Sequence, residues 1–262
     1  MTWNGSRVWV TGASSGIGEA LAVALVRRGA RVAITARRAD LLDALAEKCA
    51  RDGVSPVMAV PADVTDRAAV AAAAHTIEAA WGGIDLAIFN AGGSHERVPA
   101  GNRDPRVNAD DYVATMTLNY SSVVYGVESI LPAMLARGQG HIAAVASLGG
   151  YRAASVALSY TTSKAAVIHL MEGLRLALEP RGLRITIINP GFVRTPLTAR
   201  NTFKMPFLVE VDDAAERIVR GLERGKHEIH FPAPLSWPLK VLRMTPAPIY
   251  AWLLRRAMPR PR

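Results

Sequence analysis

Two side chains that can exchange a proton stand four residues apart in the segment SYTTSK, residues 159–164. Tyr160 and Lys164 lie within a stretch that has the apolar spacing of a helix, and residues at i and i+4 are neighbours on a helix surface. A cation beside a phenol favours the phenolate, so the pair could deliver or accept a proton near neutral pH. The alternative is an ordinary surface pair, with the tyrosine half buried and the lysine ammonium in water.

A glycine-rich segment, TGASSGIG at residues 11–18, follows the strand-like run RVWVT and precedes a helical pattern. Gly12 allows a tight turn, Gly16 lets the backbone approach a pyrophosphate, and Gly18 lets the helix pack closely on the strand. The N–H groups and the positive dipole end of that helix would then face the phosphates. The segment predicts a dinucleotide site, and the alternative is a strand-to-helix turn without a ligand.

Two arginines follow the second strand-like run, where the choice between NAD and NADP is usually made. A carboxylate at this place accepts hydrogen bonds from the ribose 2′-OH of NAD, whereas an arginine accommodates the 2′-phosphate of NADP. Arg37 and Arg38 come first here, and the first acid, Asp40, already belongs to the next helical pattern. The sequence therefore predicts NADP(H) as the preferred cofactor and NAD(H) as the second candidate. A solvated pair of arginines at a helix start is the alternative.

The elements that must position these groups form a regular alternation. The predicted strands cover residues 7–11, 31–36, 54–60, 84–90, 141–147, 183–189 and 227–231. The predicted helices lie near residues 17–28, 39–51, 66–81, 108–136, 155–179 and 212–224. Strand followed by helix, repeated in this way, predicts an α/β fold with a doubly wound parallel sheet and helices on both faces. We expect one such domain over residues 1–231.

Composition narrows the class of protein. The single cysteine, Cys49, cannot form an intramolecular disulfide, which fits a reducing compartment and leads us to expect a cytoplasmic location. We expect no leader before the first strand, and no uncharged apolar run approaches the roughly 18 residues of a spanning helix. The net charge of +9 is spread along the chain, which argues against nucleic acid and fits a phosphorylated small molecule or an anionic membrane. His75, His169 and His227 are isolated, and no spacing predicts a metal site.

Taken together, the motifs resemble those of the short-chain dehydrogenase/reductase family, in its single-domain branch with TGxxxGxG and YxxxK. The resemblance covers roughly residues 5–231 and also rests on NAG at 90–92 and on Ser147, thirteen residues before Tyr160. It implies a Rossmann fold, a homo-oligomer that is a dimer or a tetramer, and hydride transfer between a nicotinamide and a carbonyl or alcohol. It also implies a catalytic tetrad of Asn119, Ser147, Tyr160 and Lys164.

The resemblance implies a role for each of these residues. Tyr160 would be the general acid and base, and Lys164 would lower the pKa of the phenol and bind the nicotinamide ribose. Ser147 would donate to the substrate oxygen, and Asn119 would hold a water. With the residues argued above, the expected cofactor-binding set is Gly12, Ser14, Ser15, Gly16, Ile17, Gly18, Arg37, Arg38, Asp63, Val64, Asn90, Ala91, Gly92, Tyr160, Lys164, Pro190, Gly191, Val193 and Thr195. Ser15 departs from members that carry a second basic residue there, and the segment 93–109 is long for its loop.

The residues that would line the substrate pocket are indicated mainly by the resemblance. The resemblance implies a pocket lined by Tyr151, by Phe192 and by the segment PLTARNTFKMPFLVE, residues 196–210. Its apolar side chains predict an apolar ketone, aldehyde or alcohol, although they could instead pack the loop onto the protein. The alternative function is a catalytically silent dinucleotide-binding scaffold or sensor, which would need neither the phenol nor its lysine.

Residues 232–262 form a C-terminal tail of different composition, with six basic residues and no acidic one. Pro246 and Pro248 are expected to separate two helical segments. The apolar members are Leu235, Trp237, Leu239, Val241, Leu242, Met244, Ile249, Tyr250, Trp252, Leu253 and Leu254, and the basic members are Lys240, Arg243, Arg255, Arg256, Arg260 and Arg262. Such a mixture suits a peripheral segment in a membrane interface, and equally a tail that packs on its own domain or on a partner subunit.

Overall fold

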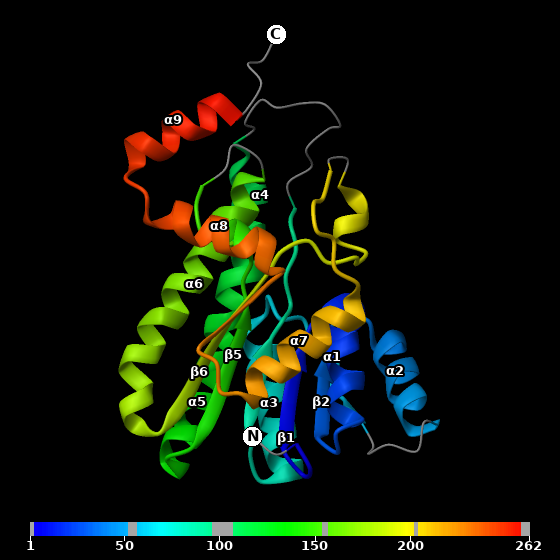
Figure 1. Cartoon of the computed structure of the whole chain (residues 1–262). Coiled ribbons are helices and arrows are strands. Elements are labelled where there is room, and N and C mark those ends of the chain that lie inside the picture. The colour runs from blue at the N-terminus through cyan, green and yellow to red at the C-terminus, as the bar shows by residue number, and fades with distance from the viewer. Residues whose placement is uncertain (1–2, 52–56, 96–106, 154–156, 202–203, 258–262) are drawn as a thin grey trace.

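The structure is a computed structural model that describes residues 3–51, 57–95, 107–153, 157–201 and 204–257. Among these residues, seven strands form one sheet in the order β3-β2-β1-β4-β5-β6-β7, and every neighbouring pair is parallel. The strands are β1 (Arg7–Thr11), β2 (Arg31–Thr35), β3 (Val57–Ala59), β4 (Leu86–Phe89), β5 (Gly140–Val145), β6 (Leu183–Pro190) and β7 (Glu228–Phe231). Figure 1 shows the sheet between its helices. The predicted doubly wound Rossmann fold is confirmed.

Helices cover both faces of the sheet. Alternate residues of each strand point to opposite faces, so each strand contributes side chains to both buried layers. Val8 and Val10 of β1 belong to one buried cluster, and Trp9 belongs to the other. The first cluster includes α1 (Gly16–Val26), α2 (Ala39–Arg51) and α7 (Val211–Glu223), and the second includes α3 (Arg67–Trp81), α5 (Ser122–Arg137) and α6 (Leu158–Leu178). Strands buried on both faces read as continuous apolar runs, which is why the sequence revealed them.

The predicted helix at 108–136 is two helices with a wider turn between them. α4 (Ala109–Met116) ends in a π-helical turn, Thr117–Ser121, and α5 follows. The Ser122 hydroxyl donates to the Leu118 carbonyl at 2.6 Å, and the amide side chain of Asn119 bonds to Gly93 outside the helix. Such turns are rare and frequently mark functional sites. The spacing of apolar residues does not reveal this π-helical turn, because polar contacts with a distant loop stabilise it.

The tail folds into two helices, α8 (Ala233–Met244) and α9 (Ala247–Ala257), separated at Thr245 and Pro246. α8 lies beside the upper part of α6, and α9 continues beyond it (Figure 1). Leu235 and Leu239 pack against the second buried cluster, and Ser236 is fully buried. The tail therefore docks on the domain through one side of α8. No helix among the described residues has the length and apolar character needed to cross a membrane.

Candidate active site

A cleft of about 430 Å³ opens at the carboxyl ends of the strands, on both sides of the neighbouring strands β1 and β4. The order of the strands reverses at this pair, and ligands of open α/β sheets bind at such a point. All of the predicted cofactor-binding residues line the cleft except Gly18 and Asp63, and so does Ser147. The fold thus gathers residues from seven separate segments of the sequence into one space, and their role in binding a cofactor stays a prediction.

The glycine turn is packed against β4 without room for side chains. Gly12 and Gly16 have φ of 69° and 61°, a conformation that favours glycine. A Cβ on Gly12 would lie 2.6 Å from the Cα of Ala91, and a Cβ on Gly18 would lie 2.4 Å from the Gly12 carbonyl oxygen. The Asn90 amide donates to the carbonyl oxygens of Thr11 and Gly12 at 3.0 and 3.2 Å. The close packing at Gly18 and the hydrogen bonds of Asn90 therefore fix the conformation of the turn.

Helix α1 begins at Gly16, so its first N–H groups belong to Gly16 and Ile17, which both line the cleft. Ser15 is the N-cap residue, and its side chain makes no capping hydrogen bond. These features suit a phosphate group, because the first N–H groups of a helix have no partner within the helix and carry its positive dipole end.

One end of the cleft carries the two arginines. The Arg38 guanidinium donates to the Ser14 hydroxyl oxygen at 2.8 Å, and Arg37 Nη1 lies 4.0 Å from a carboxylate oxygen of Asp63. Burial tends to raise the pKa of Asp63, but hydrogen bonds from Thr65 and the charge of Arg37 outweigh burial and bring the pKa below its ordinary value. Asp63 accepts from the Thr65 N–H and hydroxyl at 2.9 and 2.8 Å. It shapes the loop beside the cleft, whereas its neighbour Val64 lines the cleft.

At the other end, Ser147 from the turn after β5 comes together with Tyr160 and Lys164 from α6. The Ser147 and Tyr160 hydroxyls are hydrogen-bonded, and Lys164 Nζ lies 5.8 Å from the Tyr160 ring centroid. Burial raises the pKa of Tyr160, and the hydrogen bond from Ser147 lowers it by less, so the phenol keeps its proton at neutral pH. Burial also lowers the pKa of Lys164 to about 8. Lys164 Nζ donates to the Val145 carbonyl at 2.7 Å, which holds the ammonium against β5.

Asn119 lies behind the cleft rather than on its wall. Its side chain is fully buried, donates to the Gly93 carbonyl and the Ser163 hydroxyl at 2.8 Å each, and accepts from the Gly93 N–H at 2.8 Å. An ideal Cβ on Gly92 would lie 2.8 Å from Asn119 Oδ1 and 2.9 Å from Lys164 Nζ. The π-helical turn, the loop after β4 and α6 therefore meet in one tight corner. The expected role of Asn119 in holding a water stays a prediction.

Comparison with known proteins agrees with this geometry. A family model described as "short chain dehydrogenase" matches residues 6–205. The chain belongs to the short-chain dehydrogenase family. A Myxococcus xanthus protein named "Uncharacterized oxidoreductase" is 38% identical over 247 residues, which are 94% of this chain and 95% of that protein. The chain is thus an oxidoreductase of this family.

Two solved structures of the short-chain dehydrogenase family are similar over most of their length. A short-chain dehydrogenase from Sphingobium yanoikuyae, in complex with NADPH, has 27% identity and a TM-score of 0.78, and the match covers 98% of each chain. A short chain dehydrogenase/reductase from Burkholderia phymatum, in complex with NAD, has 22% identity and a TM-score of 0.81 over 92% of this chain and 93% of that one. The second similarity shows the shared fold.

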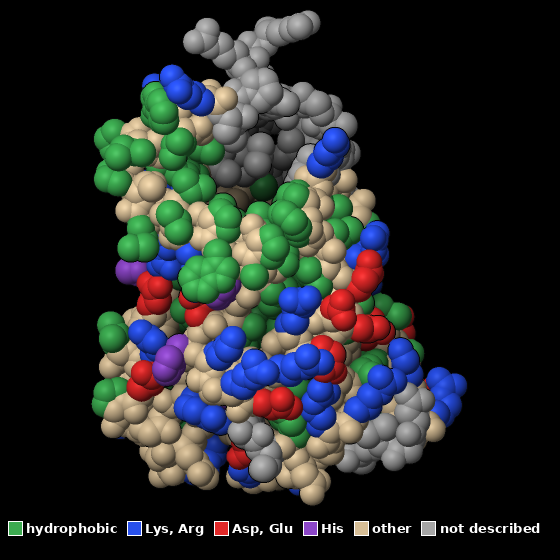
Figure 2. Space-filling view, viewed as in Figure 1, with side chains coloured by type: hydrophobic (Ala, Val, Ile, Leu, Met, Phe, Trp, Pro, Cys, Tyr) green, Lys and Arg blue, Asp and Glu red, His purple; other side chains and the backbone are tan. Residues whose placement is uncertain are grey.

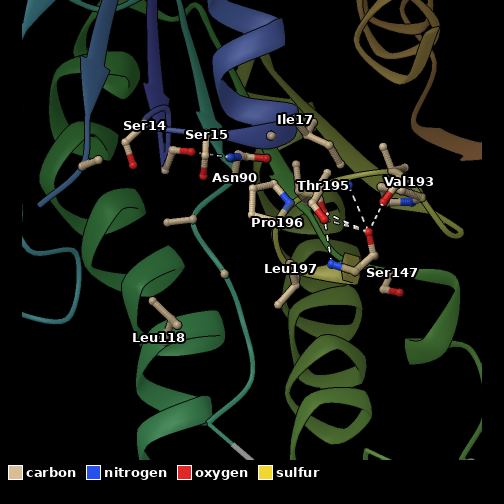
Figure 3. A pocket seen from close by; sticks show the side chains of 18 of the residues that line it. Ser14, Ser15, Ile17, Asn90, Leu118, Ser147, Val193, Thr195, Pro196 and Leu197 are labelled. Carbon is tan, nitrogen blue, oxygen red and sulfur yellow. Dashed lines mark hydrogen bonds between the residues drawn. The ribbon is translucent and has the colours of Figure 1, made fainter. Parts of the chain in front are cut away.

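The cleft of this dehydrogenase also contains residues that the sequence did not single out, namely Ala36, Ala62, Leu118, Val145 and Ala146. Pro196, Leu197 and Thr198 also line the cleft, and they belong to the segment 196–210 that was expected on the substrate side. The Thr198 hydroxyl donates to the Val193 carbonyl at 2.6 Å and accepts from the Thr195 N–H at 3.0 Å, which closes the turn after β6. Figure 3 draws dashed lines for hydrogen bonds beside the labelled Val193 and Thr195. Leu118, Val145 and Ala146 adjoin predicted residues along the chain.

Tyr151 does not line the cleft, contrary to the expectation. It is buried, and its hydroxyl bonds to the Glu228 carboxylate, which also accepts from Asn189 at 2.8 Å. Burial and this carboxylate raise the pKa of Tyr151. The short 3₁₀ turn at Leu148–Gly150 directs Tyr151 away from the cleft.

The remaining expectations on the substrate side are only partly covered by the structure. Leu197 lines the cleft and Phe207 is exposed, whereas Phe203 and most of the segment 93–109 lie outside the described residues. Within the described ranges, no group of three or more histidine, cysteine or acidic side chains could hold a metal ion.

Proposed function

We propose that this dehydrogenase is an NADP(H)-dependent enzyme that interconverts an apolar ketone or aldehyde and the corresponding alcohol, with Tyr160 as general acid and base. The observation that carries the proposal is the meeting of Ser147, Tyr160 and Lys164 at one end of the cleft that holds the glycine turn. A protein that only binds a dinucleotide has no need of a buried phenol beside a buried ammonium. Leu118, Val145 and Leu197 are apolar residues of the cleft lining, which favours an apolar substrate.

The residues of the cleft fit a phosphorylated dinucleotide. Gly12, Gly16 and the first turn of α1 would hold the pyrophosphate, and Arg37 and Arg38 would hold a 2′-phosphate. Ser14, already bonded to Arg38, lies at the same end. When bound, the cofactor supplies or accepts the hydride at the substrate carbon. NAD(H) is the second candidate, because Ser15 takes the place of a second basic residue.

The protein side chains handle the proton. In reduction, Tyr160 donates its proton to the carbonyl oxygen as the carbon gains a hydride, and the product is the alcohol. Ser147 is bonded to the Tyr160 hydroxyl, so it is placed to donate to the same oxygen and orient it. The Lys164 cation favours the phenolate that Tyr160 becomes, and in oxidation the phenolate takes the proton back. The raised pKa of Tyr160 suits an acid that must be protonated at the start of the reduction.

The test is Tyr160→Phe, measured as cofactor oxidation with a panel of apolar ketones and aldehydes. We expect kcat to fall by at least about 100-fold, because general acid–base catalysis contributes that much. The dissociation constant for NADPH should change little, since only a hydroxyl is lost. Wild-type turnover by Tyr160→Phe would show that the tyrosine is not the acid. A wild-type protein that binds NADPH but reduces no carbonyl compound would favour the scaffold or sensor instead.

We further propose that the enzyme is a homo-oligomer. Val113 of α4 and Leu176 of α6 are large apolar residues that are mostly exposed in the single chain, as is Val107 just before α4. A partner subunit that covered these helices would bury them. Sedimentation equilibrium of the full chain tests this, and a monomer at micromolar concentration would contradict it.

A further inference from the structure

The two helices of the tail carry an apolar face that the domain leaves uncovered. Trp237, Val241 and Met244 follow the i, i+4, i+7 spacing on α8, and Ile249, Trp252 and Leu253 follow i, i+3, i+4 on α9. These six side chains are between 36% and 86% exposed. Figure 2 shows hydrophobic side chains gathered over α8 and α9. We call these six residues the tail face.

The tail face is held in place by contacts on the adjacent side of α8. Lys240 Nζ lies 2.6 Å from a Glu228 carboxylate oxygen, and Arg243 lies 2.9 Å from that of Glu172 on α6. Ser236 is fully buried and bonds to His230 Nδ1 at 2.8 Å. One side of α8 therefore packs on the domain. This agrees with the expectation that the tail packs on its own domain. That packing leaves the tail face exposed.

The joint between the two helices is fixed as well. The Arg152 guanidinium donates to the Thr245 carbonyl at 3.1 Å and lies 4.6 Å from the centroid of the Tyr250 ring. The Tyr250 hydroxyl donates to the Ala153 carbonyl at 2.5 Å. These contacts orient α9 relative to α8. The two apolar stripes thus belong to one folded surface at the carboxyl-end side of the sheet (Figure 1).

The charged side chains of the tail itself are all basic. Residues 232–262 contain six basic residues and no acidic residue. Lys240 and Arg243 are used in the ion pairs with the domain, but Arg255 and Arg256 are exposed at the end of α9. The Arg256 guanidinium lies 4.2 Å from the centroid of the Trp252 ring, so a cation and an aromatic residue of the tail face are neighbours.

We propose that the tail face lies on an anionic lipid bilayer, with the apolar side chains in the interface and Arg255 and Arg256 at the headgroups. Tryptophan, leucine and arginine on one side of a helix suit that boundary, where one part of the surface meets acyl chains and the other meets anionic headgroups. The helices lie on the membrane rather than span it, since none in the described ranges is suited to crossing. This inference goes beyond the proposed function and does not depend on turnover.

The test uses the full chain, because removal of α8 would uncover the core that Leu235 and Leu239 cover. Co-sedimentation with phosphatidylcholine vesicles is compared with co-sedimentation with vesicles that also contain phosphatidylglycerol. We expect binding to the anionic vesicles, lost as salt is raised. Arg255→Glu/Arg256→Glu should weaken it by about 10- to 100-fold, at roughly 1 kcal/mol for each cation near the surface. Arg224→Glu/Lys226→Glu makes the same change of charge before β7, at the opposite end of that strand from α8, and should bind like the wild type.

Tryptophan fluorescence locates the contact. Of the five tryptophans, Trp3 and Trp9 are buried and Trp81 is partly covered, whereas Trp237 and Trp252 are more than half exposed. Brominated lipids should quench the wild-type protein, and Trp237→Phe/Trp252→Phe should bind equally well but escape that quenching. Equal binding to both kinds of vesicle, wild-type binding by Arg255→Glu/Arg256→Glu, or absence of quenching would overturn the proposal. So would conversion of a lipid-free oligomer into monomers by Trp237→Ser/Trp252→Ser, since a second copy would then cover the tail face.

Discussion

The glycine turn and the C-terminal tail meet the domain in opposite ways. At the turn, backbone touches backbone, and a Cβ on Gly18 would lie 2.4 Å from the Gly12 carbonyl oxygen. At the tail, side chains make the contacts, as Leu235 does with the buried cluster and Lys240 with Glu228. Backbone contacts cannot adjust to an added atom, whereas flexible side chains can. The turn is therefore expected to tolerate almost no substitution, and the tail to tolerate many.

The largest expected effect is at Gly18. Gly18→Ala should abolish NADPH binding and lower the free energy of unfolding by about 1–3 kcal/mol, because the new Cβ meets Gly12 and Asn90. Gly173→Ala is the matched control in α6, where an added Cβ meets nothing within 4 Å. That variant should be up to about 1 kcal/mol more stable than the wild type, because alanine is the better helix former. Titration calorimetry and urea denaturation measure both. Normal cofactor binding by Gly18→Ala would show that the turn is more adaptable than its packing indicates.

The next effect concerns the two arginines that follow β2 at one end of the cleft. Arg37→Asp should weaken NADPH binding by about 10- to 100-fold, the value of a charge-assisted contact with phosphate, and leave NADH binding nearly unchanged. The carboxylate would repel the 2′-phosphate but could accept from a ribose hydroxyl. The dissociation constants of both cofactors for wild type and variant measure this. Equal constants in the wild type would remove the basis for a preference for NADP.

Lys164 should give activity and stability opposite responses to pH. Burial lowers its pKa to about 8, so kcat/KM for carbonyl reduction should fall above that pH, by about tenfold per unit, as the cation is lost. In the same range the folded chain binds fewer protons at Lys164 than the unfolded chain, whose lysine titrates near 10.5. Stability from this residue therefore rises from about pH 8 to 10.5. The difference in melting temperature between wild type and Lys164→Met, followed across that range, isolates this contribution. A difference that does not change with pH would mean that Lys164 titrates normally.

The smallest effect is expected at the tail. Glu228→Gln removes the charge that binds Lys240 and Tyr151, and should cost about 1–2 kcal/mol of stability without changing NADPH affinity. Burial raises the pKa of Glu228, but the bonds from Lys240, Tyr151 and Asn189 outweigh it and lower the pKa below 4.5. The contribution of ionised Glu228 to the free energy of unfolding is thus present above pH 4.5 and is lost as the pH falls through the folded-state pKa of this residue. Glu172→Gln, the partner of Arg243 on an exposed surface, is the control and should cost less than about 1 kcal/mol. Equal losses for the two variants would show that burial adds nothing at Glu228.

The sequence by itself determined the sheet, its helices and the place of the glycine turn. Strands such as β1 were recognised because burial on both faces requires apolar residues throughout, and the turn was recognised because only glycine fits a positive φ and a close backbone approach. The pairing of Tyr160 with Lys164 followed from helix geometry alone. These features depend on contacts within a few residues, or on the composition that burial imposes.

The tertiary structure decided what depends on residues distant in the chain. The sequence pointed to Asn119 only through the family resemblance, and its hydrogen bonds with Gly93 and Ser163 exist because the folded chain brings both residues to a π-helical turn. Tyr151 was expected at the substrate, but β7 supplies Glu228 as its partner. The tail had two equally weighted expectations, and only docking of α8 separated its packed side from its exposed side. An amphipathic pattern fixes that a helix has two faces, but which neighbour covers each face is decided by the packing of the whole domain.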